Sequence, residues 1–308
     1  RGAKLESYAG SVFSDWTDNF YTEARVTYLK LDNRQISLAG TQFGEVQILD
    51  SGNTIFLGSD DSRHANKLAY DTLNIRLRAD WRLGDHLVTG GLERETLDVF
   101  NLFGQERQGA YIFHSIADFA AGNPSRVTLK NAATLNINDA AAEFGYSINT
   151  VYAQDKWDVA DILTITAGLR YDWYETDDKP AANAAFRARY GFTNDATLDG
   201  EGLLQPRLGF QLEATDNISI RGGAGVFSGG NPNVWLSNNY SNDGVTYIEV
   251  RDSDITLGGV NLGTYCLFAS PTCPRTFTFV NDEGGSGRPI WGQPQELLNA
   301  IAAGGRLG

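Results

Sequence analysis

Long segments in which apolar and polar residues alternate limit most strongly how this chain can fold. In residues 73–83 every odd position is apolar and every even one is Asn, Arg or Asp. Side chains of a β-strand point alternately to the two faces of a sheet, so this pattern predicts a strand with one apolar and one polar face. Residues 163–173 and 206–213 repeat it. Weaker alternation occurs at five more segments, which gives eight expected strands in all: 7–16, 20–30, 86–99, 143–157 and 218–227.

The connections between these strands alternate between short and long. Four are tight and contain aspartate, namely 17–19, 84–85, 160–161 and 216–217. The others cover roughly 31–68, 100–142 and 175–203, and residues 228–308 follow the last strand. A soluble β-sandwich gives no reason for this alternation, whereas a membrane barrel has short periplasmic turns and long extracellular loops. The sequence predicts an all-β, antiparallel transmembrane barrel segment over residues 1–227 and a long extracellular loop region over 228–308.

Two sets of side chains fit this interpretation. Tryptophans stand beside three short turns, where an interfacial aromatic girdle belongs, although a buried core role is the alternative: Trp16, Trp81 and Trp157. Arginines on the lipid face would each cost roughly 2 to 4 kcal/mol at the midplane. Four are therefore expected to face the lumen: Arg76, Arg78, Arg170 and Arg207. Apolar residues of the same strands are expected to face lipid: Leu73, Ile75, Leu77, Leu163, Ile165 and Leu169.

Composition excludes several other classes of protein. With 25 Lys and Arg against 38 Asp and Glu, the net charge is −13, which argues against a nucleic-acid binder. No segment reaches the ~18 apolar residues of a membrane helix. The chain contains no Met and begins with no signal peptide, so a processed chain or a fragment is expected. Cys266 and Cys273 suit a small loop disulfide in an oxidising compartment.

Two segments carry a family resemblance. "YAQDKWDVADILTITAGLRYDWY" (Tyr152–Tyr174) resembles the barrel signature of TonB-dependent outer-membrane receptors, and "LLQPRLGFQLEATDNISIRGGAGVF" (Leu203–Phe227) resembles the next hairpin of that family. "NLFGQERQGAYIFHSIADFAAGNPSRV" and "RYGFTNDATLDG" are most similar to Oar-like receptors. The resemblance implies a 22-stranded barrel around an N-terminal plug that imports scarce solutes with energy from a TonB complex.

Neither plug nor TonB box is present in this sequence, so it resembles a central part of such a receptor. Eight strands left open in lipid would expose unpaired backbone groups. Closure into a small eight-stranded barrel is one solution. Closure with strands outside this sequence is the other, and the resemblance favours it. The first and last strands are then expected not to pair with each other.

Residues that could carry chemistry are few. His64, His86 and His114 show no metal-site spacing, and no nucleophile elbow or P-loop occurs, so no enzyme and no metal centre is predicted. Acidic pairs in the loops could hold calcium, although a solvated surface is the simpler interpretation. They are Asp60 with Asp61, Asp177 with Asp178, Asp252 with Asp254, and Asp282 with Glu283.

Loop aromatics are the better ligand candidates. Five could form an outer vestibule, or could simply pack the loops together: Tyr111, Phe113, Phe119, Trp235 and Tyr240. Residues 115–121 are expected to form a short helical turn. The leading functional hypothesis is import of an unknown small molecule or peptide across the outer membrane of a Gram-negative bacterium. Its partners would be outer-membrane lipid and the TonB complex. A passive or structural barrel, such as a porin or adhesin, is the alternative, and a secreted enzyme on a β-sandwich is the third.

Overall fold

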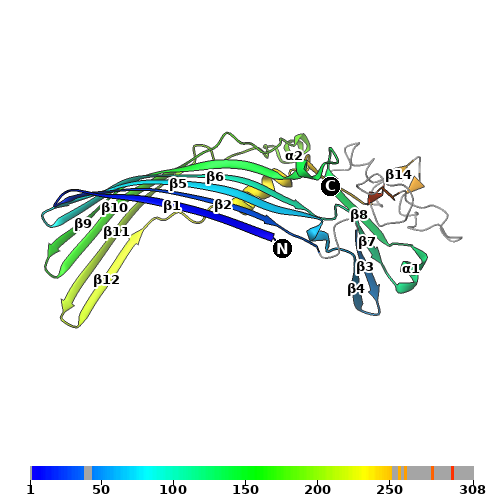
Figure 1. Ribbon diagram of the computed structural model, residues 1–308, viewed down its shortest axis with the longest axis horizontal. Coiled ribbons are helices and arrows are strands. Elements are labelled where there is room, and N and C mark those ends of the chain that lie inside the picture. Colours follow the sequence, from blue (N-terminus) through cyan, green and yellow to red (C-terminus); the bar gives the residue numbers. More distant parts are fainter. Residues whose placement is uncertain are drawn as a thin grey trace.

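The main body of the protein is a curved antiparallel sheet of eight long strands (Figure 1). The computed structural model describes residues 2–37 and 44–251, together with four two-residue strands: β14 (Thr256–Leu257), β15 (Val260–Asn261), β16 (Phe279–Val280) and β17 (Gln293–Pro294). The sheet contains β1 (Gly2–Thr17), β2 (Phe20–Arg34), β5 (Ala65–Leu83), β6 (His86–Gly104), β9 (Ala142–Ala160), β10 (Leu163–Glu175), β11 (Gly202–Thr215) and β12 (Ile218–Gly225). The predicted all-β antiparallel fold and its eight strands are confirmed.

The eight strands are hydrogen-bonded side by side in the order β1-β2-β5-β6-β9-β10-β11-β12, which is also their order in the sequence. Strands β5, β6 and β9 have 19 residues each, more than the ~9 to 11 that a membrane crossing needs. Among the described residues β1 and β12 do not pair with each other, as predicted.

Tight turns join the strands at one end of the sheet, on the left in Figure 1. The β5–β6 turn consists of Gly84 and Asp85 between the paired residues Leu83 and His86. Gly84 has a φ of 61°, in the left-handed region where a glycine is favoured. The local sequence thus fixes both the position of the turn and the register of the two strands.

Replacing Gly84 with alanine is expected to destabilise the protein by roughly 1 kcal/mol, because a residue with a Cβ is strained at this φ. A Cβ at Gly84 would meet no atom within 4 Å, so the cost comes from the backbone alone. Gly84→Asn should recover most of it, since Asn tolerates this conformation. Urea unfolding followed by tryptophan fluorescence measures the difference. Equal stability of Gly84→Ala and the wild type would contradict the expectation.

The long connections form a second sheet at the opposite end (Figure 1). Its order is β13-β8-β7-β3-β4, and β3 pairs with β7 in parallel. The five strands are β3 (Glu45–Asp50), β4 (Asn53–Leu57), β7 (Ala110–Phe113), β8 (Arg126–Ala132) and β13 (Tyr247–Arg251). The sequence predicts loops in these segments, and the structure shows strands instead. The strands have only 4 to 7 residues and come from three different connections, so no local alternation reveals their pairing.

Short helices complete the connections. They are η1 (Asp61–Arg63), α1 (Ile116–Ala121), η2 (Ile137–Ala140), α2 (Ala184–Tyr190) and α3 (Asn233–Ser241). The predicted turn at 115–121 is α1: the Ser115 hydroxyl accepts from the Asp118 backbone N–H at 3.0 Å, and Gly122 ends the helix with a φ of 65°. Across the described part of the chain, no helix is both long and apolar enough to cross a membrane.

Candidate lumen site

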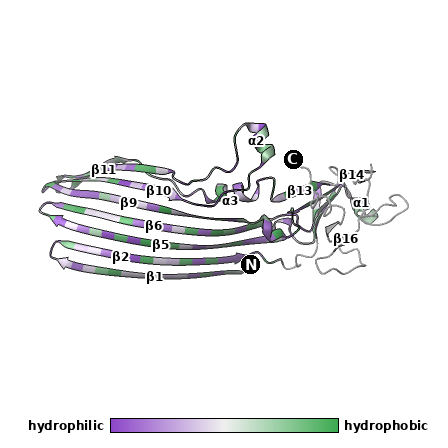
Figure 2. Cartoon of the chain, turned by 90° about the horizontal axis from the view of Figure 1, so that it is seen from above, coloured by the Kyte–Doolittle hydropathy of each residue, from purple (hydrophilic) through white to green (hydrophobic). Residues whose placement is uncertain are grey.

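The register separates the side chains of the main sheet into an apolar face and a polar face. Leu77 lies opposite Leu92, and Leu169 lies opposite Ala153 and Pro206. The side chains of Leu77 and Leu169 are each 49% exposed, and Leu208 is 59% exposed. Figure 2 shows the underlying alternation of apolar and polar residues along the strands. An exposed apolar face of this extent is typical of a wall that contacts lipid.

The predicted interfacial tryptophans lie on the apolar face at the turn end. The Trp16 indole N–H donates to the Thr22 hydroxyl at 2.8 Å. Trp81 packs edge-on against Phe20, its partner across the strands, with ring centroids 6.3 Å apart. Trp157 stacks on His86 at 5.2 Å. All three indoles are well exposed, as a girdle in the headgroup region requires.

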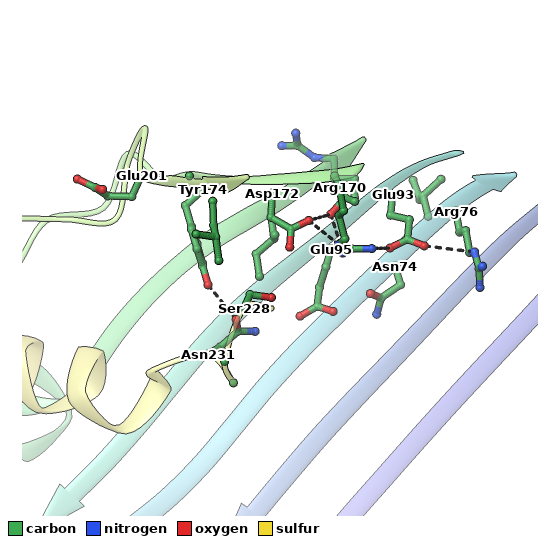
Figure 3. Close-up of a pocket in the computed structure, with 18 of the residues that line it drawn as sticks. Asn74, Arg76, Glu93, Glu95, Arg170, Asp172, Tyr174, Glu201, Ser228 and Asn231 are labelled. Carbon is green, nitrogen blue, oxygen red and sulfur yellow. Dashed lines mark hydrogen bonds and ion pairs between the residues drawn. The ribbon is translucent and has the colours of Figure 1, made fainter. Parts of the chain in front are cut away.

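The polar face carries a chain of alternating charges (Figure 3). Glu93 of β6 bridges two arginines: its Oε1 lies 3.3 Å from Arg76 Nε, and its Oε2 lies 3.0 Å from Arg170 Nη1. Arg170 Nε also lies 2.8 Å from Asp172 Oδ1. Each charge therefore faces a counter-charge, which reduces the cost of holding these groups inside a barrel.

Strands β9 and β11 extend this ion network with neutral groups. The Asp172 carboxylate accepts from the Thr150 hydroxyl at 2.7 Å and from the Gln205 amide at 2.6 Å. Gln205 Oε1 in turn accepts from Arg207 Nη2 at 3.0 Å. Gln205 is fully buried and Asp172 is 7% exposed. The fourth predicted arginine, Arg78, lies apart from this network and pairs with Asp80 at 2.9 Å.

Residues 226–241, called the strap here, fold back onto the polar face after β12. The Val226 N–H donates to Pro206 O at 2.9 Å, and the Ser228 N–H donates to Gln205 Oε1 at 3.1 Å. The Tyr174 hydroxyl then donates to Asn231 Oδ1 at 3.0 Å. The strap is thus fixed to the same buried amide that ends the ion network.

Helix α3 forms the second half of the strap and packs on the loop end of the polar face. The Tyr146 hydroxyl donates to Asn233 Oδ1 at 2.6 Å, and Asn101 Nδ2 donates to Ser237 Oγ at 2.7 Å. Tyr240 stacks on Phe144 with centroids 5.0 Å apart. Sequence reasoning missed the strap, because α3 has no apolar periodicity. The sequence feature that could have indicated this contact is the set of asparagines in α3, one of which, Asn233, binds the sheet.

A cavity of about 580 Å³ lies between the strap and the ion network. Its walls include charged groups of both signs, among them Arg76, Glu93, Glu95 and Arg170, and the strap residues 228–231. The mixed lining suits a polar solute that both donates and accepts hydrogen bonds.

The five vestibule candidates divide into two groups. Tyr111 and Phe113 are fully buried in the second sheet, and Phe119 packs edge-on against Phe113 at 5.3 Å. Full burial leaves Tyr111 and Phe113 no surface for a ligand, so a packing role replaces the predicted binding role. Trp235 and Tyr240 lie on the strap, where Trp235 is 79% exposed.

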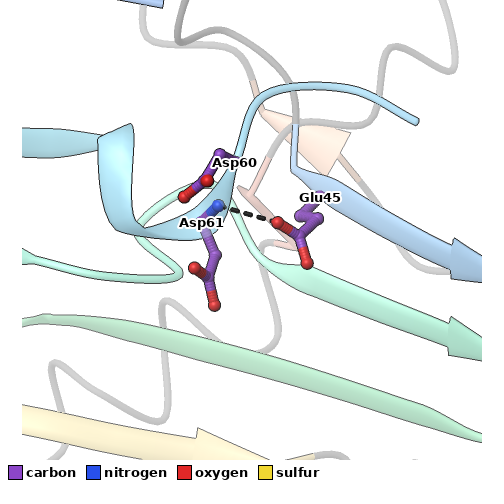
Figure 4. A group of neighbouring side chains, drawn as sticks. All are labelled: Glu45, Asp60 and Asp61. Carbon is purple, nitrogen blue, oxygen red and sulfur yellow. Dashed lines mark hydrogen bonds between the residues drawn. The ribbon is translucent and has the colours of Figure 1, made fainter. Parts of the chain in front are cut away.

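The predicted acidic pair Asp60 and Asp61 lies beside a third carboxylate, that of Glu45. Ligand atoms of Glu45, Asp60 and Asp61 lie within 4.8 Å of one another (Figure 4). Glu45 Oε2 accepts from the Asp61 backbone N–H at 2.9 Å, and Glu45 Oε1 accepts from the Gln47 amide at 2.6 Å. Burial raises the pKa of Asp61, and the neighbouring Glu45 and Asp60 raise it further. Calcium binding here stays a prediction.

The other acidic predictions have different outcomes. Asp178 accepts from the Gly145 N–H at 2.6 Å and so helps to fix a strand. The remaining acidic pairs and the predicted Cys266–Cys273 disulfide lie outside the described residues.

Comparison with known proteins identifies the family. The family described as "Outer membrane beta barrel domain" matches residues 11–281. No curated protein matches the sequence. Similar solved structures include the outer membrane transporter YddB from Escherichia coli, with 16% identity and a TM-score of 0.49 over 83% of this chain. The copper transporter OprC has 15% identity and a TM-score of 0.42 over 73% of it.

The ferric-catecholate import receptor Fiu from K12 E. coli has 15% identity and a TM-score of 0.40 over 78% of this chain. The matches cover 29% of YddB, 32% of OprC and 36% of Fiu, so the chain spans about a third of these proteins. The family match shows that the chain belongs to the outer membrane β-barrel domain family and resides in the outer membrane of a Gram-negative bacterium.

Proposed function

We propose that the chain forms part of the wall of a TonB-dependent, Oar-like outer-membrane transporter that imports a solute without catalysis. One observation carries this proposal: the strap is fixed across the polar face above a continuous ion network. A passive pore needs an open aqueous lumen, whereas a gated transporter needs a wall with attachment points for a substrate. The resemblance of Tyr152–Tyr174 to TonB-dependent receptors supports the same choice.

The sheet edges support a barrel larger than eight strands. The outer edge of β1 and that of β12 have no partner among the described strands. Lipid cannot satisfy a backbone N–H or C=O group, so these edges require further strands in the membrane. We propose that such strands complete the barrel around residues 1–227, that residues 228–308 belong to its extracellular side, and that a plug connects it to the TonB complex.

Energy dependence of uptake tests this function against the passive alternative. Cells with and without the protein are incubated in a complex medium, and the solutes removed from the medium are identified by mass spectrometry. The proposal expects at least one solute to be depleted only by cells that contain the protein. An uncoupler of the proton gradient should stop that depletion. Depletion that continues with the uncoupler would favour a porin, and identical media would contradict transport.

A further inference from the structure

A second cavity, of about 400 Å³, lies between helix α3 and the main sheet. The sheet supplies an apolar and aromatic lining from β5, β6 and β9: Leu68, Tyr70, Leu97, Val99 and Phe144. Helix α3 closes the other side with Val234 and polar residues, including Asn233 and Ser237. The cavity therefore offers apolar walls of a size suited to a small organic group.

Glu95 borders both this cavity and the larger one above the ion network. Figure 3 shows it beside Asn74 and Ser228, pointing into the larger cavity. No described residue donates a hydrogen bond to Glu95 or forms an ion pair with it. Glu93, two residues earlier on the same face, has both oxygens engaged by Arg76 and Arg170. Glu95 is thus the one carboxylate that borders both cavities, and it lacks a counter-charge within the described part of the protein.

We propose that the two cavities together bind an organic cation. Its apolar body would lie under α3, and its ammonium or guanidinium group would pair with Glu95. A half-buried carboxylate without a counter-charge gains most from a charged hydrogen-bond donor, and the apolar lining beneath α3 suits the body of an organic cation. An anionic solute would be repelled by the same carboxylate. This inference rests on the proposed transport function, because it names the class of solute.

Three probes of the same shape and different charge test the inference: 2-phenylethylammonium, 2-phenylethanol and phenylacetate. The protein is purified from outer membranes in detergent, and binding is measured by isothermal titration calorimetry after subtraction of a titration into micelles alone. The ammonium ion is expected to bind at least ~10-fold more tightly than the alcohol, and phenylacetate is expected not to bind.

Glu95→Gln should remove the preference for the ammonium ion and leave binding of the alcohol unchanged. Asp98→Asn is the matched control, because Asp98 lies on the opposite face of the same strand and lines neither cavity. This control should retain the preference. The wild-type comparison of the three probes decides the question even if Glu95→Gln fails to assemble.

The inference is overturned if the wild-type protein binds the alcohol as tightly as the ammonium ion, or binds neither. It is also overturned if an assembled Glu95→Gln variant keeps the preference. These outcomes are distinct from failure of the transport proposal. If the uncoupler stops uptake but the protein shows no preference for the cation, only this inference fails. If the protein binds the cation but uptake does not depend on energy, only the proposed function fails.

Discussion

Replacing Leu77 with arginine is expected to destabilise the protein in a bilayer by roughly 2 to 4 kcal/mol. Leu77 lies in the middle of the apolar face, paired with Ala24 and Leu92, and its side chain is 49% exposed. A guanidinium there would have to leave water for hydrocarbon, and only partial snorkelling would relieve the cost. Unfolding by urea in phospholipid vesicles, followed by tryptophan fluorescence, measures the change.

Leu203→Arg is the matched control for this substitution. Leu203 lies on the polar face opposite Asp172 and borders the cavity above the ion network. An arginine at this position would remain in water beside a carboxylate, so we expect a change within about 1 kcal/mol. Equal destabilisation by the two substitutions would mean that the two faces of the sheet do not differ in their contact with lipid.

Replacing Asp172 with alanine is expected to destabilise the protein by about 3 kcal/mol. Asp172 accepts hydrogen bonds from Thr150 and Gln205 and pairs with Arg170 at 2.8 Å. Its removal leaves the fully buried Gln205 amide without its acceptor and leaves Arg170 with one of its two carboxylates. Loss of one partner from a buried network costs more than the pair contributes, because the remaining groups are already desolvated.

Asp71→Ala is the matched control for this carboxylate. Asp71 lies 3.6 Å from Lys30, and both side chains are well exposed, at 38% and 49%. An exposed pair of this kind contributes about 0 to 1 kcal/mol. The same urea unfolding experiment should therefore separate the two variants by about 2 kcal/mol or more. Similar losses from both would contradict the buried role assigned to Asp172.

The main sheet was predictable because its signals are local. Alternation in 73–83 assigns each side chain to a face, and a two-residue turn such as Gly84–Asp85 fixes the register of the strands beside it. Trp81 and Arg76 could therefore be assigned to opposite faces from the sequence alone. The same pattern predicted which arginines lie on the polar face.

The second sheet and the strap could not be predicted in this way, because their partners are distant in sequence. Val46 pairs with Tyr111 in parallel, and no short turn joins their two strands to indicate this pairing. Likewise, Tyr146 meets Asn233 across 87 positions of the chain. For the same reason the sequence around Tyr111 predicts a ligand site, because its neighbours in sequence give no sign of the sheet that buries it.

The central claim is that one face of the main sheet contacts lipid and the other faces water. Spin labels attached to single cysteines at each position of 73–78, in a background with Cys266 and Cys273 replaced by serine, test it most directly. In vesicles, oxygen concentrates in the bilayer and a nickel chelate in water. The account predicts that labels at positions 73, 75 and 77 collide preferentially with oxygen, and those at 74, 76 and 78 with the chelate. Equal accessibility at all six positions, or the reverse alternation, would contradict it.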